Sequence, residues 1–133
     1  IVKAITEVFP DSEIEILTSR KQMQQKLRDA SAEDAFKDAW ERLCEVPPPP
    51  TDIIVVGFGG DGEHPIHDRW IVGESSGLRL GTSANSLGHL RVSEMSELDQ
   101  AQTIERGLLI DKVLNKGTRD WQGHKLSRVR FSL

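Results

Sequence analysis

The chain has 133 residues, of which 37% are hydrophobic and 29% are charged, and it contains a single cysteine. A chain of this size can bury a core as one globular domain without disulfides or a structural metal. Its formal net charge of −4 argues against a protein that coats nucleic acid through bulk positive charge. A lone cysteine cannot form an internal disulfide, which suits a reducing compartment such as the cytoplasm. No apolar run approaches the roughly 20 residues that span a bilayer.

The charge is unevenly distributed along the chain. Residues 105–133 contain seven Lys or Arg against three Asp or Glu, a local charge of +4 that leaves −8 on residues 1–104. A basic C-terminal quarter is either a plain solvated surface or a face that holds an anionic strand, and the sequence leaves both interpretations open. The chain begins with Ile1 and not with Met, so we expect one domain over 1–133 that belongs to a longer protein.

The first third of the chain alternates between helical and extended patterns. Apolar residues at helical spacing predict a short helix over the first nine residues, and the alternation in Glu13–Thr18 predicts a strand. Residues 19–45 carry an apolar stripe, with a capping-box-like second start at Ser31. This segment predicts one kinked helix or two short ones, with Trp40 in the core.

The middle of the chain predicts the centre of a sheet. Four prolines at 47–50 favour an extended connector, and residues 52–58 follow with a continuous β-branched run. Such a run is typical of a central strand that is buried on both faces. After a glycine-rich loop, residues 66–72 and 78–80 predict two strands that pair as an antiparallel hairpin.

The last third predicts a helix between two further extended segments. Residues 91–98 predict a short edge strand or a loop. Residues 98–114 predict a helix whose inward stripe has four members: Ala101, Ile104, Leu108 and Val113. Residues 125–133 predict a closing strand with two faces, apolar at Val129, Phe131 and Leu133 and cationic at Arg128 and Arg130. The whole pattern predicts an α/β fold, a mixed β-sheet flanked by helices on its faces.

A histidine and an arginine alternate in the first strand of the predicted hairpin. Side chains two apart on a strand share a face, so His67 and Arg69 lie side by side while Asp68 and Trp70 face away, Trp70 toward the core. The second strand leads into Gly81-Thr82-Ser83-Ala84-Asn85, a small polar turn. Together these residues predict a nucleophile or acid–base group beside a phosphate clamp.

This pattern has a family resemblance. His67-x-Arg69, four further residues, Glu74 and then Gly81-Thr82-Ser83-Ala84-Asn85 resembles the phospholipase D superfamily signature, His-x-Lys-x4-Asp followed by Gly-Ser-x-Asn. The resemblance covers residues 66–88 and implies the family's α/β fold and a reaction without metal or cofactor. It implies that His67 attacks phosphorus to form a phosphohistidine, while a second histidine from another copy of the motif protonates the leaving oxygen.

The other motif residues take their roles from the same resemblance. It implies Arg69 and Asn85 as ligands of the phosphoryl oxygens, Ser83 as a hydrogen-bond donor, and Glu74 and Thr82 as supporting residues. Arg69 replaces the family's lysine, Glu74 replaces its aspartate, and Thr82 is an insertion or replaces the glycine before serine. Because arginine binds phosphate well and glutamate is close to aspartate, these changes preserve phosphate binding better than turnover.

The chain carries one such motif, so the second histidine must come from a homodimer partner or from another part of a longer chain. We therefore predict a phospholipase D-type phosphodiesterase, a hydrolase that cleaves DNA or RNA rather than lipid. The preference rests on the basic C-terminal quarter and the lack of an amphipathic membrane helix. The alternative is a non-catalytic phosphate-recognition or assembly module of a larger protein, similar to the lipid-binding phospholipase D-like module of MIT-domain proteins. A third interpretation is a structural domain with a coincidental motif.

Residues outside the motif are weaker candidates. Three further histidines occur: His64, His89 and His124. None of them has metal-ligand spacing with Cys44 or with the acids, so we expect no metal site. Trp121, in the basic C-terminal quarter, is a better candidate for stacking a base than Trp70.

Overall fold

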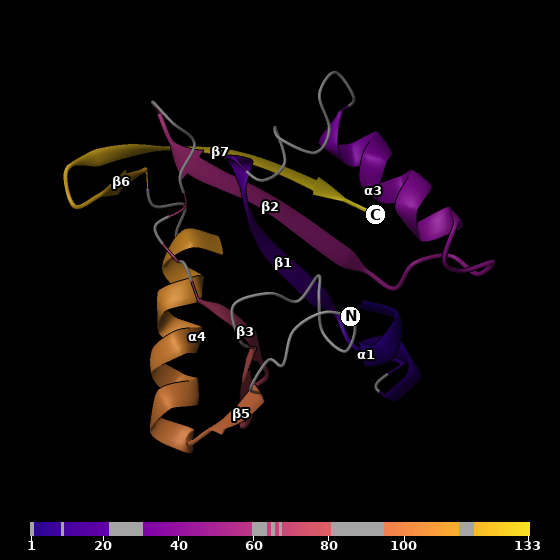
Figure 1. The fold of residues 1–133 in the computed structure, drawn as a ribbon, viewed down its shortest axis with the longest axis horizontal. Helices are drawn as coiled ribbons and strands as arrows, with labels where there is room; N and C mark the ends of the chain where they lie inside the picture. The colour runs from indigo at the N-terminus through magenta and orange to yellow at the C-terminus, as the bar shows by residue number, and fades with distance from the viewer. Residues whose placement is uncertain are drawn as a thin grey trace. The chain divides into compact units, whose positions relative to one another are not determined.

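Helices and strands are interleaved along the chain, which confirms the predicted α/β class (Figure 1). The structure is a computed structural model, and it describes residues 2–8, 10–21, 31–59, 64, 66, 68–80, 95–114 and 119–133. The chain divides into two compact units, unit 1 (Ile1–Pro65 with Arg119–Leu133) and unit 2 (Ile66–Thr118). In the described part of the chain, the helices are all too short or too polar to cross a membrane.

Unit 1 is built around the strand β2 (Thr51–Phe58), which lies inside a sheet of order β1–β2–β7–β6. β1 (Ile14–Ser19) pairs with β2 in parallel, and β7 (His124–Ser132) pairs antiparallel on the other side. Four consecutive apolar side chains of β2 are buried: Ile53, Ile54, Val55 and Val56. Burial on both faces explains the unbroken β-branched run, and it confirms the predicted central strand.

The edge of this sheet is a tight hairpin between β6 (Asp120–Trp121) and β7. Its two turn residues, Gln122 and Gly123, both have positive φ, at 52° and 83°. Positive φ at both central positions matches the twist of a two-residue hairpin, and glycine adopts it without strain. The Gly123 N–H donates to the Asp120 carboxylate over 3.0 Å, which closes the turn.

The predicted closing strand is confirmed as β7, but its predicted apolar face is only partly correct. Phe131 packs against Phe36, with ring centroids 5.8 Å apart. Val129 shares that face by alternation and is nevertheless 57% exposed. On the other face Arg130 donates to Asp52 of β2, so this arginine belongs to a cross-strand ion pair.

Two helices of unit 1 begin and end near the predicted positions. α1 (Val2–Val8) and α3 (Ala32–Glu41) are described, whereas residues 22–30 of the predicted 19–45 segment lie outside the described residues. The Asp34 N–H donates to the Ser31 hydroxyl over 3.1 Å, so Ser31 caps α3 as predicted. Trp40 is buried, and its Nε1–H donates to the Val46 carbonyl over 2.8 Å, which confirms its place in the core.

Unit 2 contains a three-stranded antiparallel sheet of order β3–β4–β5, followed by a helix. β3 (Arg69–Val72) and β4 (Gly77–Leu80) form the predicted hairpin, and β5 (Met95–Leu98) adds the predicted edge strand. The prediction of one mixed sheet is wrong for the described residues, whose strands form two sheets. β2 is paired with β1 and β7, and the meander β3–β5 forms its own sheet.

The helix of unit 2 is α4 (Gln100–Leu114), and its predicted inward stripe is largely wrong. Ile104 and Leu108 are 53% and 57% exposed, and Ala101 is exposed too, whereas Thr103 is 2% exposed and Val113, as predicted, is 1% exposed. A Cβ added to Gly107 would lie 3.9 Å from Val72 of β3, so the packed stripe runs through this glycine. Small residues such as Gly107 and polar residues such as Thr103 let the helix approach the sheet closely. A prediction from the spacing of hydrophobic residues overlooks both, because neither is hydrophobic.

Candidate functional site

Arg69 is the first residue of β3, in the β3–β4 hairpin. Arg69 lies directly opposite Leu80 in the antiparallel register, so the chain enters β3 and leaves β4 at one end, which we call the open end. Arg69 is half-buried there, and Leu80 is buried. Four other motif residues lie outside the described residues: His67, Thr82, Ser83 and Asn85.

Glu74 does not lie near Arg69. It is exposed in the turn that joins β3 to β4, where the Gly73 N–H donates to the Ser76 carbonyl over 2.8 Å. Strand residues rise about 3.3 Å each, so the four residues of β3 separate this turn from the open end by roughly 13 Å. The structure therefore does not bring Glu74 together with Arg69. Any supporting role of Glu74 is restricted to the turn between β3 and β4.

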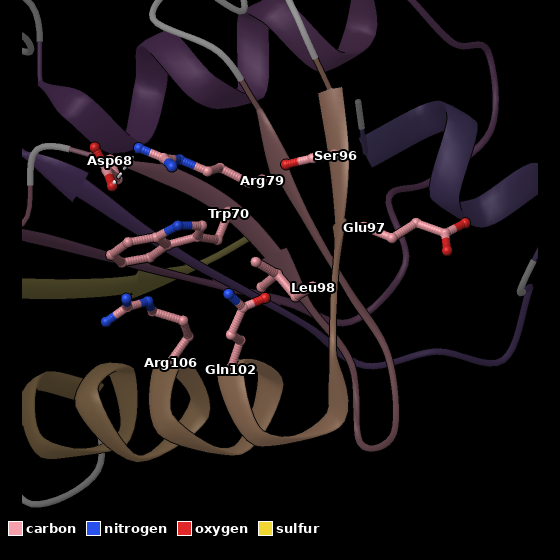
Figure 2. A pocket seen from close by; sticks show the side chains of 8 residues that line it. All are labelled: Asp68, Trp70, Arg79, Ser96, Glu97, Leu98, Gln102 and Arg106. Atoms are coloured by element: carbon pink, nitrogen blue, oxygen red, sulfur yellow. Dashed lines mark hydrogen bonds and ion pairs between the residues drawn. The ribbon is translucent and has the colours of Figure 1, made fainter.

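The opposite face of the sheet carries a polar hollow of about 160 Å³, which we call the Arg–Trp hollow (Figure 2). Trp70 and Arg79 are cross-strand partners, and alternation places them on the face that Arg69 does not occupy. The hollow is lined by residues of β4, β5 and α4 and of the chain entering β3: Asp68, Trp70, Arg79, Ser96, Glu97, Leu98, Gln102 and Arg106.

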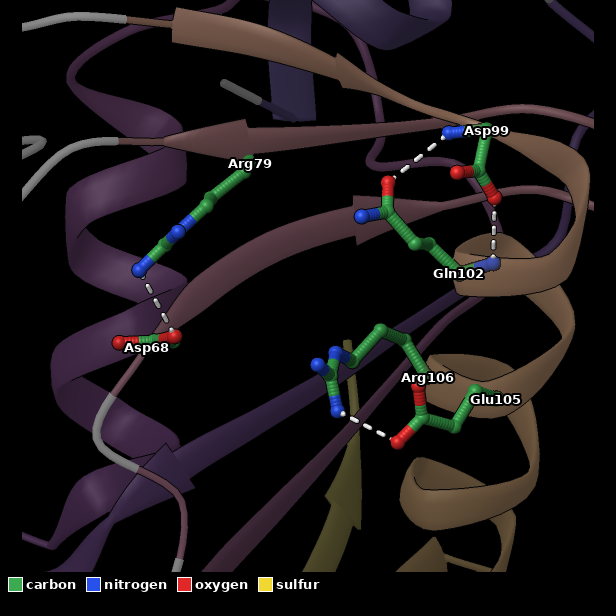
Figure 3. A network of polar contacts seen from close by, with 6 residues as sticks. All are labelled: Asp68, Arg79, Asp99, Gln102, Glu105 and Arg106. Atoms are coloured by element: carbon green, nitrogen blue, oxygen red, sulfur yellow. Dashed lines mark hydrogen bonds and ion pairs between the residues drawn. The ribbon is translucent and has the colours of Figure 1, made fainter.

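Two arginines flank the indole of Trp70 in this hollow. The Arg106 guanidinium carbon lies 5.0 Å from the ring centroid, a cation–π contact from α4 to β3. Arg79 Nη2 lies 3.2 Å from the Asp68 carboxylate, an ion pair across the hairpin (Figure 3). Trp70 faces away from Arg69 as predicted, but it is half-buried under Arg106 and not enclosed in a core.

The start of α4 is fixed by a reciprocal cap beside the hollow. The Gln102 N–H donates to the Asp99 carboxylate over 2.8 Å, and the Asp99 N–H donates to the Gln102 side-chain oxygen over 3.1 Å (Figure 3). This capping box satisfies two backbone donors and sets the helix start. One turn later Arg106 also pairs with its exposed neighbour Glu105 over 3.2 Å, a contact that contributes little in water.

The charge and size of the hollow restrict what it can hold. Glu97 belongs to the other face of β5 by alternation, and in Figure 2 its carboxylate points away from Trp70. The hollow thus brings two guanidinium groups to one face, and each has one carboxylate beside it, Asp68 for Arg79 and Glu105 for Arg106. Its volume of about 160 Å³ is below the 300–1,000 Å³ typical of whole-ligand pockets, and it suits one small anionic group.

Sequence reasoning missed Arg79 and Arg106. Arg79 follows from the hairpin register, because it is the cross-strand partner of Trp70. Arg106 has no comparable local signal, since its position depends on how α4 packs over the sheet. Strand alternation places Asp68 and Trp70 on one face, and the motif predicts that this face lies away from the site.

Of the other predicted candidates, His89 lies outside the described residues, and the rest lie in unit 1. His64 is buried, Trp121 is half-buried, and His124 is exposed with its ring 5.4 Å from that of Phe58. Cys44 is half-buried. Among the residues that the structure describes, no group of three His, Cys, Asp or Glu side chains is arranged to hold a metal ion.

One ion pair of unit 1 has a clear electrostatic consequence. The Arg130 guanidinium and the Ser132 hydroxyl both donate to the Asp52 carboxylate, and these hydrogen bonds hold the pKa of Asp52 below its ordinary value. The same bond raises the pKa of Arg130. Part of the basic C-terminal quarter is therefore neutralised within the sheet.

Comparison with known proteins found no matching family model, no matching curated protein and no matching solved structure. The resemblance to the phospholipase D superfamily therefore depends on the motif residues themselves.

Proposed function

We propose that unit 2 recognises phosphodiesters at the open end of the β3–β4 hairpin, with Arg69 as the principal cation. The observation that carries this proposal is the register of Arg69 with Leu80. Because the chain enters β3 and leaves β4 at the same end, both halves of the motif are connected to that end. A guanidinium group offers a planar fork of N–H donors that matches two oxygens of a phosphate.

We also propose a second candidate function, the predicted phospholipase D-type cleavage of DNA or RNA, which the same register favours. An imidazole nitrogen of His67 would bond to phosphorus while the bond from phosphorus to the leaving oxygen breaks. A second histidine, from a homodimer partner or another motif, would donate a proton to that oxygen, and water would then hydrolyse the phosphohistidine. This second proposal also includes the prediction that the chain has a phospholipase D-like fold.

Binding is tested with a fluorescein-labelled single-stranded oligonucleotide and fluorescence anisotropy. We expect Arg69→Gln to raise the Kd about tenfold, the loss of one charge-assisted contact worth about 1.4 kcal/mol. Arg42→Gln, the same charge change at an exposed site just after α3, should leave the Kd unchanged. Equal affinity of the Arg69 variant and the wild type would overturn the proposal.

Cleavage is tested separately with bis(4-nitrophenyl) phosphate and with DNA in excess chelator. Activity that survives the chelator and disappears in His67→Ala would establish the second candidate. Binding without activity above that variant would restrict the function to recognition.

A further inference from the structure

We propose that the Arg–Trp hollow is a second phosphate site, which holds one backbone phosphodiester of a single-stranded nucleic acid through the guanidinium groups of Arg79 and Arg106. This site is distinct from the one at Arg69, because Arg69 points to the other face of β3. Nothing in the motif assigns a role to Arg79, Arg106 or Trp70.

The first argument is donor supply. Each guanidinium has five N–H donors. Among the described residues, Arg79 uses Nη2 on Asp68 and Arg106 uses Nη1 on Glu105. Arg79 keeps 58% of its side-chain surface exposed and Arg106 keeps 31%, so both can reach an anion that enters the hollow. Two partly exposed forks that line one hollow are an arrangement suited to phosphate.

The second argument is preorganisation. The Arg106 guanidinium lies over the Trp70 ring, 5.0 Å from its centroid. Side chains already fixed in position lose less conformational entropy when they bind. The volume of about 160 Å³ admits the phosphate group, and the attached sugars and bases would stay outside.

The third argument distinguishes nucleic acid from a membrane surface. A helix that lies on a membrane has an apolar face and a polar face rich in Lys and Arg. α4 exposes Ile104 and Leu108, but its charged residues are two acids and two bases, Glu105, Asp111, Arg106 and Lys112. β3 is at the edge of its three-stranded sheet, so a flexible single strand can pass around that edge from Arg69 to the hollow. This last step rests on the proposed function.

The experiment measures oligonucleotide binding of Arg79→Gln, Arg106→Gln and the double variant at several salt concentrations. We expect each single variant to raise the Kd about tenfold. We expect the slope of log K against log salt to fall by about 0.7, the value for one phosphate on a single strand. The double variant should lose no more slope than that, because both arginines hold the same phosphate. Arg42→Gln is the matched control.

Two further arms keep the outcome decisive. Arg106→Lys retains the charge but not the fork, so its Kd should lie between those of the wild type and Arg106→Gln. Inorganic phosphate and vesicles with anionic lipid serve as alternative probes. The inference would be overturned if Arg79→Gln and Arg106→Gln both kept the Kd and the slope of the wild type. It would also be overturned if these variants lost vesicle binding but kept oligonucleotide binding. If only Arg69→Gln weakens binding, the proposed function stands and this second site fails. If only Arg79→Gln and Arg106→Gln weaken binding, this second site stands and the proposed function fails.

Discussion

Gly77 of β4 and Gly107 of α4 lie on the two surfaces that pack together beneath the Arg–Trp hollow, and replacing each with alanine should have opposite effects. A Cβ at Gly77 would lie 2.9 Å from Leu98 Cδ1 and 3.3 Å from the carbonyl oxygen of Ile71. The Leu98 methyl can move, but the Ile71 carbonyl belongs to the backbone of β3. A Cβ at Gly107 would lie 3.9 Å from Val72 Cγ1, an ordinary van der Waals contact.

These distances determine the sign of each change. Overpacking at Gly77 costs about 1–3 kcal/mol, and removing a glycine from a strand returns about 0.5–1 kcal/mol. Gly77→Ala should therefore lower the free energy of unfolding of unit 2 by up to about 2.5 kcal/mol. Gly107→Ala should raise it by about 1 kcal/mol, the helix-propensity difference between the two residues.

Hydrogen exchange of the β3, β4 and β5 amides reports the opening free energy of this unit directly. A Cβ at Gly77 would also lie 3.4 Å from Thr103 Oγ1 of α4, so Gly77→Ala should displace α4, which carries Arg106, and weaken oligonucleotide binding. Equal effects of the two substitutions on exchange would refute the packing described for the sheet and α4.

Two predictions concern unit 1. The folded pKa of Asp52 lies below its unfolded value, so its contribution to stability is present above about pH 4 and is lost as the pH falls through the folded pKa. Urea unfolding between neutral pH and acid should therefore show a smaller loss of stability in Asp52→Asn than in the wild type, and parallel curves would contradict the ion pair with Arg130. Ser31→Ala removes the cap of α3 and should lower the free energy of unfolding by about 1 kcal/mol, whereas Ser12→Ala, outside any helix, is the control; equal stability of the two variants would rule out the cap.

Strong local signals explain which elements could be predicted from the sequence. β2 follows from four consecutive β-branched residues, and their complete burial is what such a run requires. The β3–β4 hairpin follows from two short alternating segments and the turn between them. α3 follows from its cap at Ser31. In each case a few neighbouring residues contain the information.

Features that depend on distant contacts were harder to predict. The packed face of α4 runs through Thr103 and Gly107, which do not stand out as hydrophobic, so periodicity selected the exposed Ile104 and Leu108 instead. The candidate site was predicted in part for the same reason. Arg69 could be found from the motif, whereas Arg106 becomes a site residue only when α4 packs over Trp70.

The most direct test of phosphodiester recognition is a titration of the protein with a thymidine dinucleotide, followed by amide ¹H–¹⁵N chemical shifts. The largest shifts should occur at the open end of the hairpin, at Arg69 and Leu80, with little change at Glu74 in the opposite turn. Arg69→Gln should move the titration of these shifts to about tenfold higher dinucleotide concentration, while leaving the rest of the spectrum intact. Shifts confined to the Glu74 turn, or an unchanged titration in the variant, would contradict the account.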